Sequence, residues 1–206
     1  MKQARYDAGA LLRAEVVAAM CLLAAGLAAG CASKTSYGDA TAQETLTIDF
    51  GSTDLQMIAA KMVDSLLSSP LVRDNPTPVV RVSRVRNKTD EHIDTKAITD
   101  KIRTALINSG KVRFVAGEVR DEIIDELEYQ RGSGYVDEAT RKRIGMLVGA
   151  DYLLVGDFTS IRKKSGRTED LYYLFTLNLV DIQTGLIAWS DQKEIRKAAK
   201  RPIFGL

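Results

Sequence analysis

Hydrophobic residues recur three and four positions apart in two stretches of the chain, residues 54–69 and 94–110. This spacing places them on one face of an α-helix. Thr53 or Asp54 can cap the start of the first helix, and Gly110 can end the second in a left-handed conformation. The residues expected to be buried are Leu55, Ile58, Ala59, Met62, Val63, Leu66 and Leu67 in the first helix, and Ile98, Ile102, Ala105 and Leu106 in the second.

Residues 118–129 and 137–148 predict two more helices, because their apolar residues also follow a helical period. The stretch Gly132-Ser133-Gly134 between them predicts a flexible joint. The residues expected to face inward are Val119, Ile123, Ile124 and Leu127, and then Ile144, Leu147 and Val148.

Five stretches of the chain predict β-strands, and three of them lie in the last third, where apolar residues follow the two-residue period of a strand. The expected strands are residues 79–83, 111–115, 152–158, 171–179 and 186–192. Residues 152–158 are apolar almost throughout, which is typical of a central strand, and the last three strands follow each other through short turns. We therefore predict an α+β fold, with a small, mainly antiparallel sheet of four to five strands flanked by about four helices.

The first thirty residues have the pattern of a signal peptide. Lys2, Arg5 and Arg13 give a basic start, and residues 16–29 form an apolar run of fourteen residues. A helix of that length spans about 21 Å, too little to cross a ~30 Å hydrocarbon core. Small residues at positions 28–30 suit a peptidase, so we expect cleavage after Gly30.

Cys31 follows directly on these small residues, an arrangement that resembles the lipobox of bacterial lipoproteins. The resemblance implies that Cys31 is the lipid attachment site. The chain has two cysteines and the other, Cys21, lies in the segment expected to be removed, so the mature chain would hold no disulfide. Ala32-Ser33 resembles the sorting signal for the outer membrane, which implies an anchor in its inner leaflet, facing the periplasm. An ordinary secretory signal with an incidental Cys31 is the alternative.

Removing thirty of the 206 residues leaves 176, enough for one domain with a substantial core. We expect a flexible tether at residues 31–50, the α+β domain at 51–195 and a basic tail at 196–206. Residues 1–30 carry a net charge of +1 and the whole chain +2, so the mature chain is nearly neutral. That balance argues against a nucleic-acid partner.

Nothing in the sequence supports catalysis or a cofactor. The chain has one histidine, His92, in an acidic turn, so a nucleophile and base pair or an imidazole zinc site is not expected. No phosphate-binding Gly-rich loop and no Gly-x-Ser-x-Gly elbow is present. We expect a protein that is not an enzyme and that binds no metal.

Basic residues gather at two places that could meet an acidic partner. Arg162, Lys163, Lys164 and Arg167 surround one expected hairpin turn. A second group lies near the end of the chain, at Lys193, Arg196, Lys197, Lys200 and Arg201. We take the first group as the candidate partner-binding residues; a solvated turn is the alternative.

Four stretches resemble the LpoB family of lipoprotein activators of class A penicillin-binding proteins. They are Asn87-Lys88-Thr89, residues 102–111, residues 148–154 and residues 180–190. The resemblance covers residues 50–194. It implies a small antiparallel sheet flanked by helices, and a protein that docks on a bifunctional peptidoglycan synthase and stimulates it without catalysing a reaction itself.

Two alternatives remain. The stretch at residues 180–190 is also similar to segments of the TolB N-terminal domain and of the secretion lipoprotein CsgG, so a CsgG-like secretion role is one of them. A scaffold lipoprotein of the cell envelope is the other. We expect a monomer with a class A penicillin-binding protein as its partner.

Overall fold

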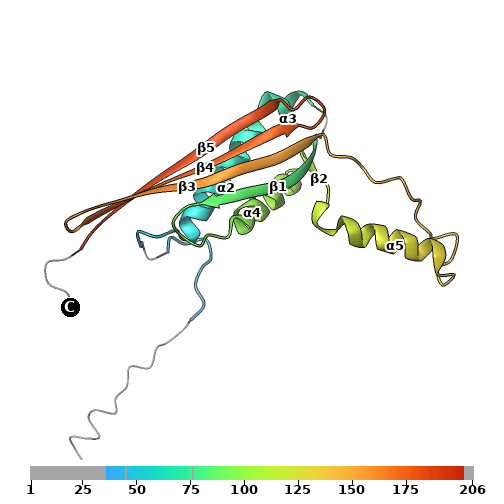
Figure 1. Ribbon diagram of the computed structural model, residues 1–206, viewed down its shortest axis with the longest axis horizontal. Coiled ribbons are helices and arrows are strands. Elements are labelled where there is room, and N and C mark those ends of the chain that lie inside the picture. Colours follow the sequence, from blue (N-terminus) through green and yellow to red (C-terminus); the bar gives the residue numbers. More distant parts are fainter. Residues whose placement is uncertain (1–35, 45, 76, 202–206) are drawn as a thin grey trace, which may run out of the picture. The chain divides into compact units, whose positions relative to one another are not determined.

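The computed structural model describes residues 36–44, 46–75 and 77–201 (Figure 1). The expected signal peptide, Cys31 and the end of the expected tail lie outside the described residues. The helices are α2 (Ser52–Ser68), α3 (Pro70–Asp74), α4 (Thr95–Asn108) and α5 (Arg120–Gly132), with a short 3-10 helix, η1 (Gly117–Val119). The strands are β1 (Val79–Lys88), β2 (Arg113–Phe114), β3 (Tyr152–Ser165), β4 (Thr168–Asp181) and β5 (Ile187–Lys200). Within the described residues, no helix is long and apolar enough to cross a membrane.

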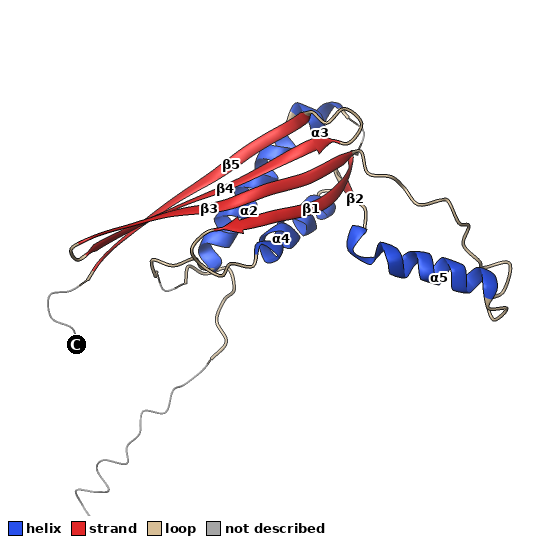
Figure 2. Cartoon of the chain, in the orientation of Figure 1, coloured by secondary structure: helices blue, strands red, loops and turns tan. Residues whose placement is uncertain are grey.

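The five strands form one sheet in the order β2-β1-β3-β4-β5, which makes β3 the central strand (Figure 2). Strands β3, β4 and β5 pair antiparallel through short turns, as the sequence predicts. Strand β1 pairs parallel with both β2 and β3. Parallel neighbours need a crossover, and α4 supplies the one between β1 and β2. The α+β prediction is confirmed, with a sheet that is partly parallel.

Helices α2 and α4 cover one face of this sheet, which we call the covered face (Figure 1). The alternating residues of β4 that point to it are completely buried, as the two-residue period predicts. They are Leu171, Tyr173, Phe175, Leu177 and Leu179. The residues between them are only half-buried and lie on the opposite face, which we call the open face.

The caps of the helices explain where they begin and end. Helix α4 begins where the sequence predicted, and Asp94 caps it by accepting hydrogen bonds from the amides of Lys96 and Ala97. Gly110 follows its end at φ 69°, a conformation that favours glycine. Ala105 was expected in the core but is exposed on α4.

The predicted helix at residues 137–148 is wrong, because this stretch has no helix and Ile144, Leu147 and Val148 are each at least half exposed. Gly145 has a φ of 84°, which no α-helix accommodates. Helix α5 forms, but the prediction that it buries Ile124 is also wrong, since α5 has no buried residue. A periodic apolar face needs a surface to cover, and α2 and α4 already occupy the covered face.

Strands β1, β3, β4 and β5 are longer than predicted, whereas β2 is shorter than the predicted stretch at residues 111–115. Strand β1 continues to Lys88 and β5 to Lys200, whereas the sequence predicted ends at residues 83 and 192. In β5 the charged residues that suggested a tail alternate with buried or half-buried ones, and in β1 the exposed Arg84 and Arg86 flank the buried Val85. One side of each strand therefore stays in water. As a result, the β3–β4 hairpin and the end of β5 extend past α2 and α4 (Figure 1).

Candidate functional site

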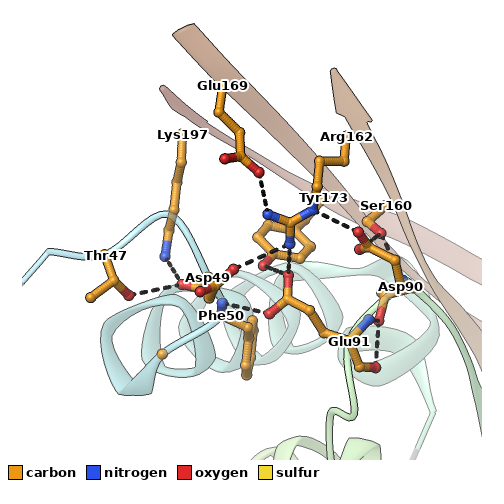
Figure 3. Close-up of polar contacts among 12 residues, drawn as sticks. Thr47, Asp49, Phe50, Asp90, Glu91, Ser160, Arg162, Glu169, Tyr173 and Lys197 are labelled. Atoms are coloured by element: carbon orange, nitrogen blue, oxygen red, sulfur yellow. Dashed lines mark hydrogen bonds and ion pairs between the residues drawn. The ribbon is translucent and has the colours of Figure 1, made fainter. Parts of the chain in front are cut away.

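Arg162 of β3 is the centre of a polar cluster on the covered face (Figure 3). Its guanidinium donates to Asp90 at 2.6 Å, Glu91 and Glu169 at 2.8 Å each, and Asp49 at 3.2 Å. Only a fifth of the Arg162 side chain is exposed. Arg162 lies opposite Leu171 of β4, so the same alternation that buries β4 directs it inward. We call Arg162 and these four carboxylates, with Tyr173, the Arg162 cluster.

Glu91 joins the Arg162 cluster to the core. It accepts a hydrogen bond from the Tyr173 hydroxyl and another from the Phe50 amide at 2.9 Å. The Phe50 ring packs edge-on against Phe158 at 5.4 Å and Tyr173 at 6.0 Å between ring centroids. Phe50 was expected at the end of a flexible tether, yet it is packed against the domain.

We call residues 46–50, through which the chain enters the domain, the entry segment. Lys197 of β5 also contacts this segment. Its ammonium donates to the backbone oxygen of Asp49 at 2.6 Å and forms an ion pair with the Asp54 carboxylate. Asp54 also accepts from the Gly51 amide at 2.9 Å and thereby caps α2. Contacts from β3, β5 and α2 therefore fix the place where the chain enters the domain.

The electrostatics of the cluster favour its charged form. Hydrogen bonds from Arg162 lower the pKa of Glu169 and of Asp90 below their ordinary values. Its carboxylate partners, Glu169 first, raise the pKa of Arg162. Burial, and then the hydrogen bond to Glu91, raise the pKa of Tyr173, which stays neutral and serves as a donor.

Asn87 shapes the loop that supplies Asp90 and Glu91. Its side-chain amide donates to the backbone oxygens of Glu91 at 2.9 Å and Ile93 at 3.2 Å, and its oxygen accepts from the Thr89 amide at 3.0 Å. The Asn87-Lys88-Thr89 stretch thus fixes the conformation of this loop. It contributes to the site by positioning the carboxylates of Asp90 and Glu91.

Two other stretches that carry the family resemblance also shape turns. The Asp181 carboxylate accepts from the amide and hydroxyl of Thr184, at 2.7 and 2.9 Å, and Gly185 follows at φ 73°. The Thr184 amide is the main cause of the lowered pKa of Asp181. Asp151 accepts from the Val79 amide at 3.0 Å and joins the starts of β1 and β3.

The four candidate partner-binding residues do not form one patch. Arg162 belongs to the cluster on the covered face, and Lys164 pairs with Glu169 at 3.2 Å. Lys163 is exposed and lines a hollow on the open face, and Arg167 is exposed in the turn after Gly166. The structure therefore divides a single sequence cluster between two faces and a turn.

The Arg162 cluster is satisfied within the chain. Every buried side-chain nitrogen and oxygen of the described residues has a hydrogen-bond partner. The same residues contain no group of three His, Cys, Asp or Glu side chains that could hold a metal ion. The cluster joins the entry segment, the loop after β1 and the hairpin, and its chemistry is that of a structural junction.

The fold and this junction define a small α+β domain held to an N-terminal entry segment. The family model described as peptidoglycan-synthase activator LpoB matches residues 54–195, which is more than half of the chain. The chain therefore belongs to the LpoB family, a family of regulatory activators. The resemblance found in the sequence is confirmed.

Solved structures of that family are similar to this chain. The LpoB C-terminal domain from Salmonella enterica is 21% identical, and the match covers 69% of this chain and 98% of that one, at a TM-score of 0.42. The NMR structure of E. coli LpoB is also 21% identical, and the match covers 84% of this chain and 80% of that one, at a TM-score of 0.42. No curated protein matches the chain. Family membership rests on the family model alone.

Proposed function

We propose that this protein is an outer-membrane lipoprotein that binds a class A penicillin-binding protein and stimulates peptidoglycan synthesis. The observation that carries the proposal is the match of the LpoB family model to residues 54–195, nearly the whole folded domain. The signal-peptide pattern and Cys31 agree with it, because both suit a chain exported to the periplasm and held there by lipid.

The contacts of the entry segment fit this role. A lipid on Cys31 would hold the chain at the membrane. Asp49 and Phe50 are tied to β3, β5 and the loop after β1. A pull on the tether would thus act on the sheet through several contacts instead of on the start of α2 alone.

Lys163 and Arg167 are better candidates for partner binding than Arg162 and Lys164. Arg162 and Lys164 already form ion pairs with Glu169 of the same chain. Lys163 and Arg167 are exposed and form no ion pair among the described residues. Replacing both with alanine is expected to slow association with the synthase at low salt, by a few-fold, because exposed charges mainly affect association rates. An unchanged association rate would remove these residues from the proposal.

The activity test is glycan-chain polymerisation by the organism's own class A synthase, with and without the soluble domain, residues 32–206. The proposal predicts a rate increase that saturates as the domain is added. If the domain neither binds the synthase nor changes its rate, the activator role is wrong. A scaffold or secretion role would then replace it.

A further inference from the structure

The open face of the sheet carries an excess of positive charge. On β1, β3, β4 and β5, the register places six cationic side chains on this face, from Arg81 on β1 to Lys200 on β5, against three carboxylates. Arg84, at the register shift of β1, is a seventh, because it lines a hollow with Val155 and Asn178. One of the three, Asp157, is already shared by Arg86 at 2.8 Å and Lys88 at 3.2 Å. The cations that form no ion pair within the described residues include Arg84, Lys163, Arg196 and Lys200.

Two hollows on this face each contain one of the unpaired arginines. Arg84 lines a hollow of about 290 Å³ together with Val155 and Asn178. Arg196 lines another, of about 310 Å³, together with Ile161 and Tyr172. The Arg196 guanidinium lies 5.8 Å from the centroid of the Tyr172 ring, which orients it without neutralising it. Each hollow also contains a carboxylate: Asp157 in the first is already paired with Arg86 and Lys88, and Asp170 in the second lies beside Lys163. Each hollow therefore keeps one arginine without an ion pair, which can donate to an entering carboxylate.

Apolar side chains line both hollows, Val155 in the first and Ile161 and Tyr172 in the second, and Leu174 lies between the hollows on β4. Ile161 is 57% exposed, and Tyr172, Leu174 and Val155 are half-buried. Exposed apolar side chains beside arginines are common in protein–protein interfaces, where Tyr and Arg are frequent anchors.

The dimensions of the face suit a protein domain. Strands β3, β4 and β5 each have 14 residues, and at about 3.3 Å per residue they extend roughly 46 Å. Four strands spaced about 4.8 Å apart give a width of roughly 14 Å, and hence an area of about 650 Å². A standard interface buries about 800 Å² on each partner. A single glycan strand would cover only a narrow part of this area.

We infer that the open face is a docking surface for an acidic protein surface, one that places a carboxylate in each hollow and apolar groups against Val155, Ile161 and Tyr172. The inference rests on the proposed function, since the occupant is the periplasmic part of the synthase. The complementary charge also distinguishes this face from α5, which carries five acidic and two basic side chains.

The test compares binding of two double variants to the purified, detergent-solubilised class A synthase. Arg84→Glu with Arg196→Glu reverses the charge in both hollows. Arg73→Glu with Arg131→Glu is the matched control, because it changes the net charge equally at exposed sites on α3 and α5. We expect the first pair to raise the dissociation constant about tenfold or more. The dissociation constant of the control should stay within about twofold of the wild-type value.

A third variant, Ile161→Ser, separates contact from long-range attraction. Ile161 is exposed, so the substitution leaves the core intact. We expect it to speed dissociation a few-fold with little effect on the association rate, because apolar contacts act after encounter. An unchanged dissociation rate for Ile161→Ser would contradict the apolar contact, and wild-type binding by the Arg84/Arg196 pair would contradict the docking surface as a whole.

The outcomes separate the inference from the function on which it rests. If wild type does not bind the synthase, both are wrong. If wild type binds and the Arg84/Arg196 pair binds equally well, only the inference is wrong. Loss of binding to purified peptidoglycan sacculi, with synthase binding unchanged, would assign the face to glycan and overturn the inference. Loss of a self-association seen by sedimentation, again with synthase binding unchanged, would assign it to a second copy and do the same.

Discussion

The two faces of the sheet use their charged residues differently. On the covered face, Arg162 forms ion pairs with four carboxylates and Lys197 forms one with Asp54, so both cations are neutralised within the chain. On the open face, Arg84, Lys163 and Arg196 have no carboxylate partner in the part of the chain that the structure describes. Adjacent residues of one strand, Arg162 and Lys163, belong to different sides of this division. A basic cluster in a sequence therefore predicts a binding surface only after its residues are assigned to faces.

The largest effect is expected from Arg162→Ala. Removing the guanidinium leaves Glu91, less than a fifth exposed, beside Asp90 without a counter-charge, and leaves Glu169 with only the exposed Lys164 and Arg201. Breaking such a group typically costs about 3 kcal/mol in the free energy of unfolding. Urea unfolding of the soluble domain measures it. Lys163→Ala, one residue away, is the control and should change this free energy by less than about 0.5 kcal/mol. Equal effects of the two variants would contradict the division.

The second effect is on the pH dependence of stability. The pKa values of Asp90 and Glu169 are lowered, first by hydrogen bonds from Arg162, from ordinary values of 3.8 and 4.5. Carboxyl groups with lowered pKa values stabilise the fold above the unfolded values, and this stability is lost as the pH falls through the folded ones. Wild type should therefore lose stability below about pH 4.5, measured by urea unfolding between pH 7 and 3.

Arg162→Ala sharpens this test. Without the guanidinium the two pKa values are lowered less, because only Ser160 still donates to Asp90 and Lys164 to Glu169, so the variant should lose less stability over the same pH window. Asp157 and Asp181 retain their own donors, Arg86 and the Thr184 amide, and supply the slope that remains. Parallel pH profiles for variant and wild type would show that the Arg162 cluster does not stabilise the fold through its charges.

A smaller effect is expected from Tyr173→Phe. The substitution keeps the buried ring and removes only the hydroxyl that donates to Glu91. We expect a loss of about 1–2 kcal/mol in the free energy of unfolding, by urea titration. Tyr172→Phe, on the open face, is the matched control and should change it by less than about 0.5 kcal/mol. A larger loss for Tyr172→Phe would reverse the assignment of the two faces.

The smallest effect on stability is expected from the double variant Arg84→Glu with Arg196→Glu. Neither side chain forms an ion pair among the described residues, and only the contact of Arg196 with Tyr172 is lost. The free energy of unfolding should therefore stay within about 1 kcal/mol of wild type. Unfolding of this variant would mean that the open-face cations support the fold.

The regular part of the fold was predictable from the sequence. The alternation from Leu171 to Leu179 predicts the covered face of β4, and Asp94 and Gly110 predict the ends of α4. These signals are local, since each depends on the residue's own spacing or backbone conformation. The helix predicted at residues 137–148 failed because a helical period says nothing about whether a surface is available to cover it.

The Arg162 cluster was only partly predictable. Continuing the alternation of β3 beyond Phe158 to Ser160 and Arg162 would have placed Arg162 on the buried side. Its partners could not be found this way. Asp49, Asp90 and Glu169 come from three separate segments, and only the folded chain brings them together.

The most direct test is a titration of the class A synthase's polymerisation rate with two forms of the soluble domain, wild type and Arg84→Glu with Arg196→Glu. We predict that wild type raises the rate to a plateau. The variant should reach the same plateau, but at a concentration about tenfold or more higher, because it is folded and binds more weakly. No increase with wild type would contradict the activator role, and superimposable curves would contradict the role of the open face.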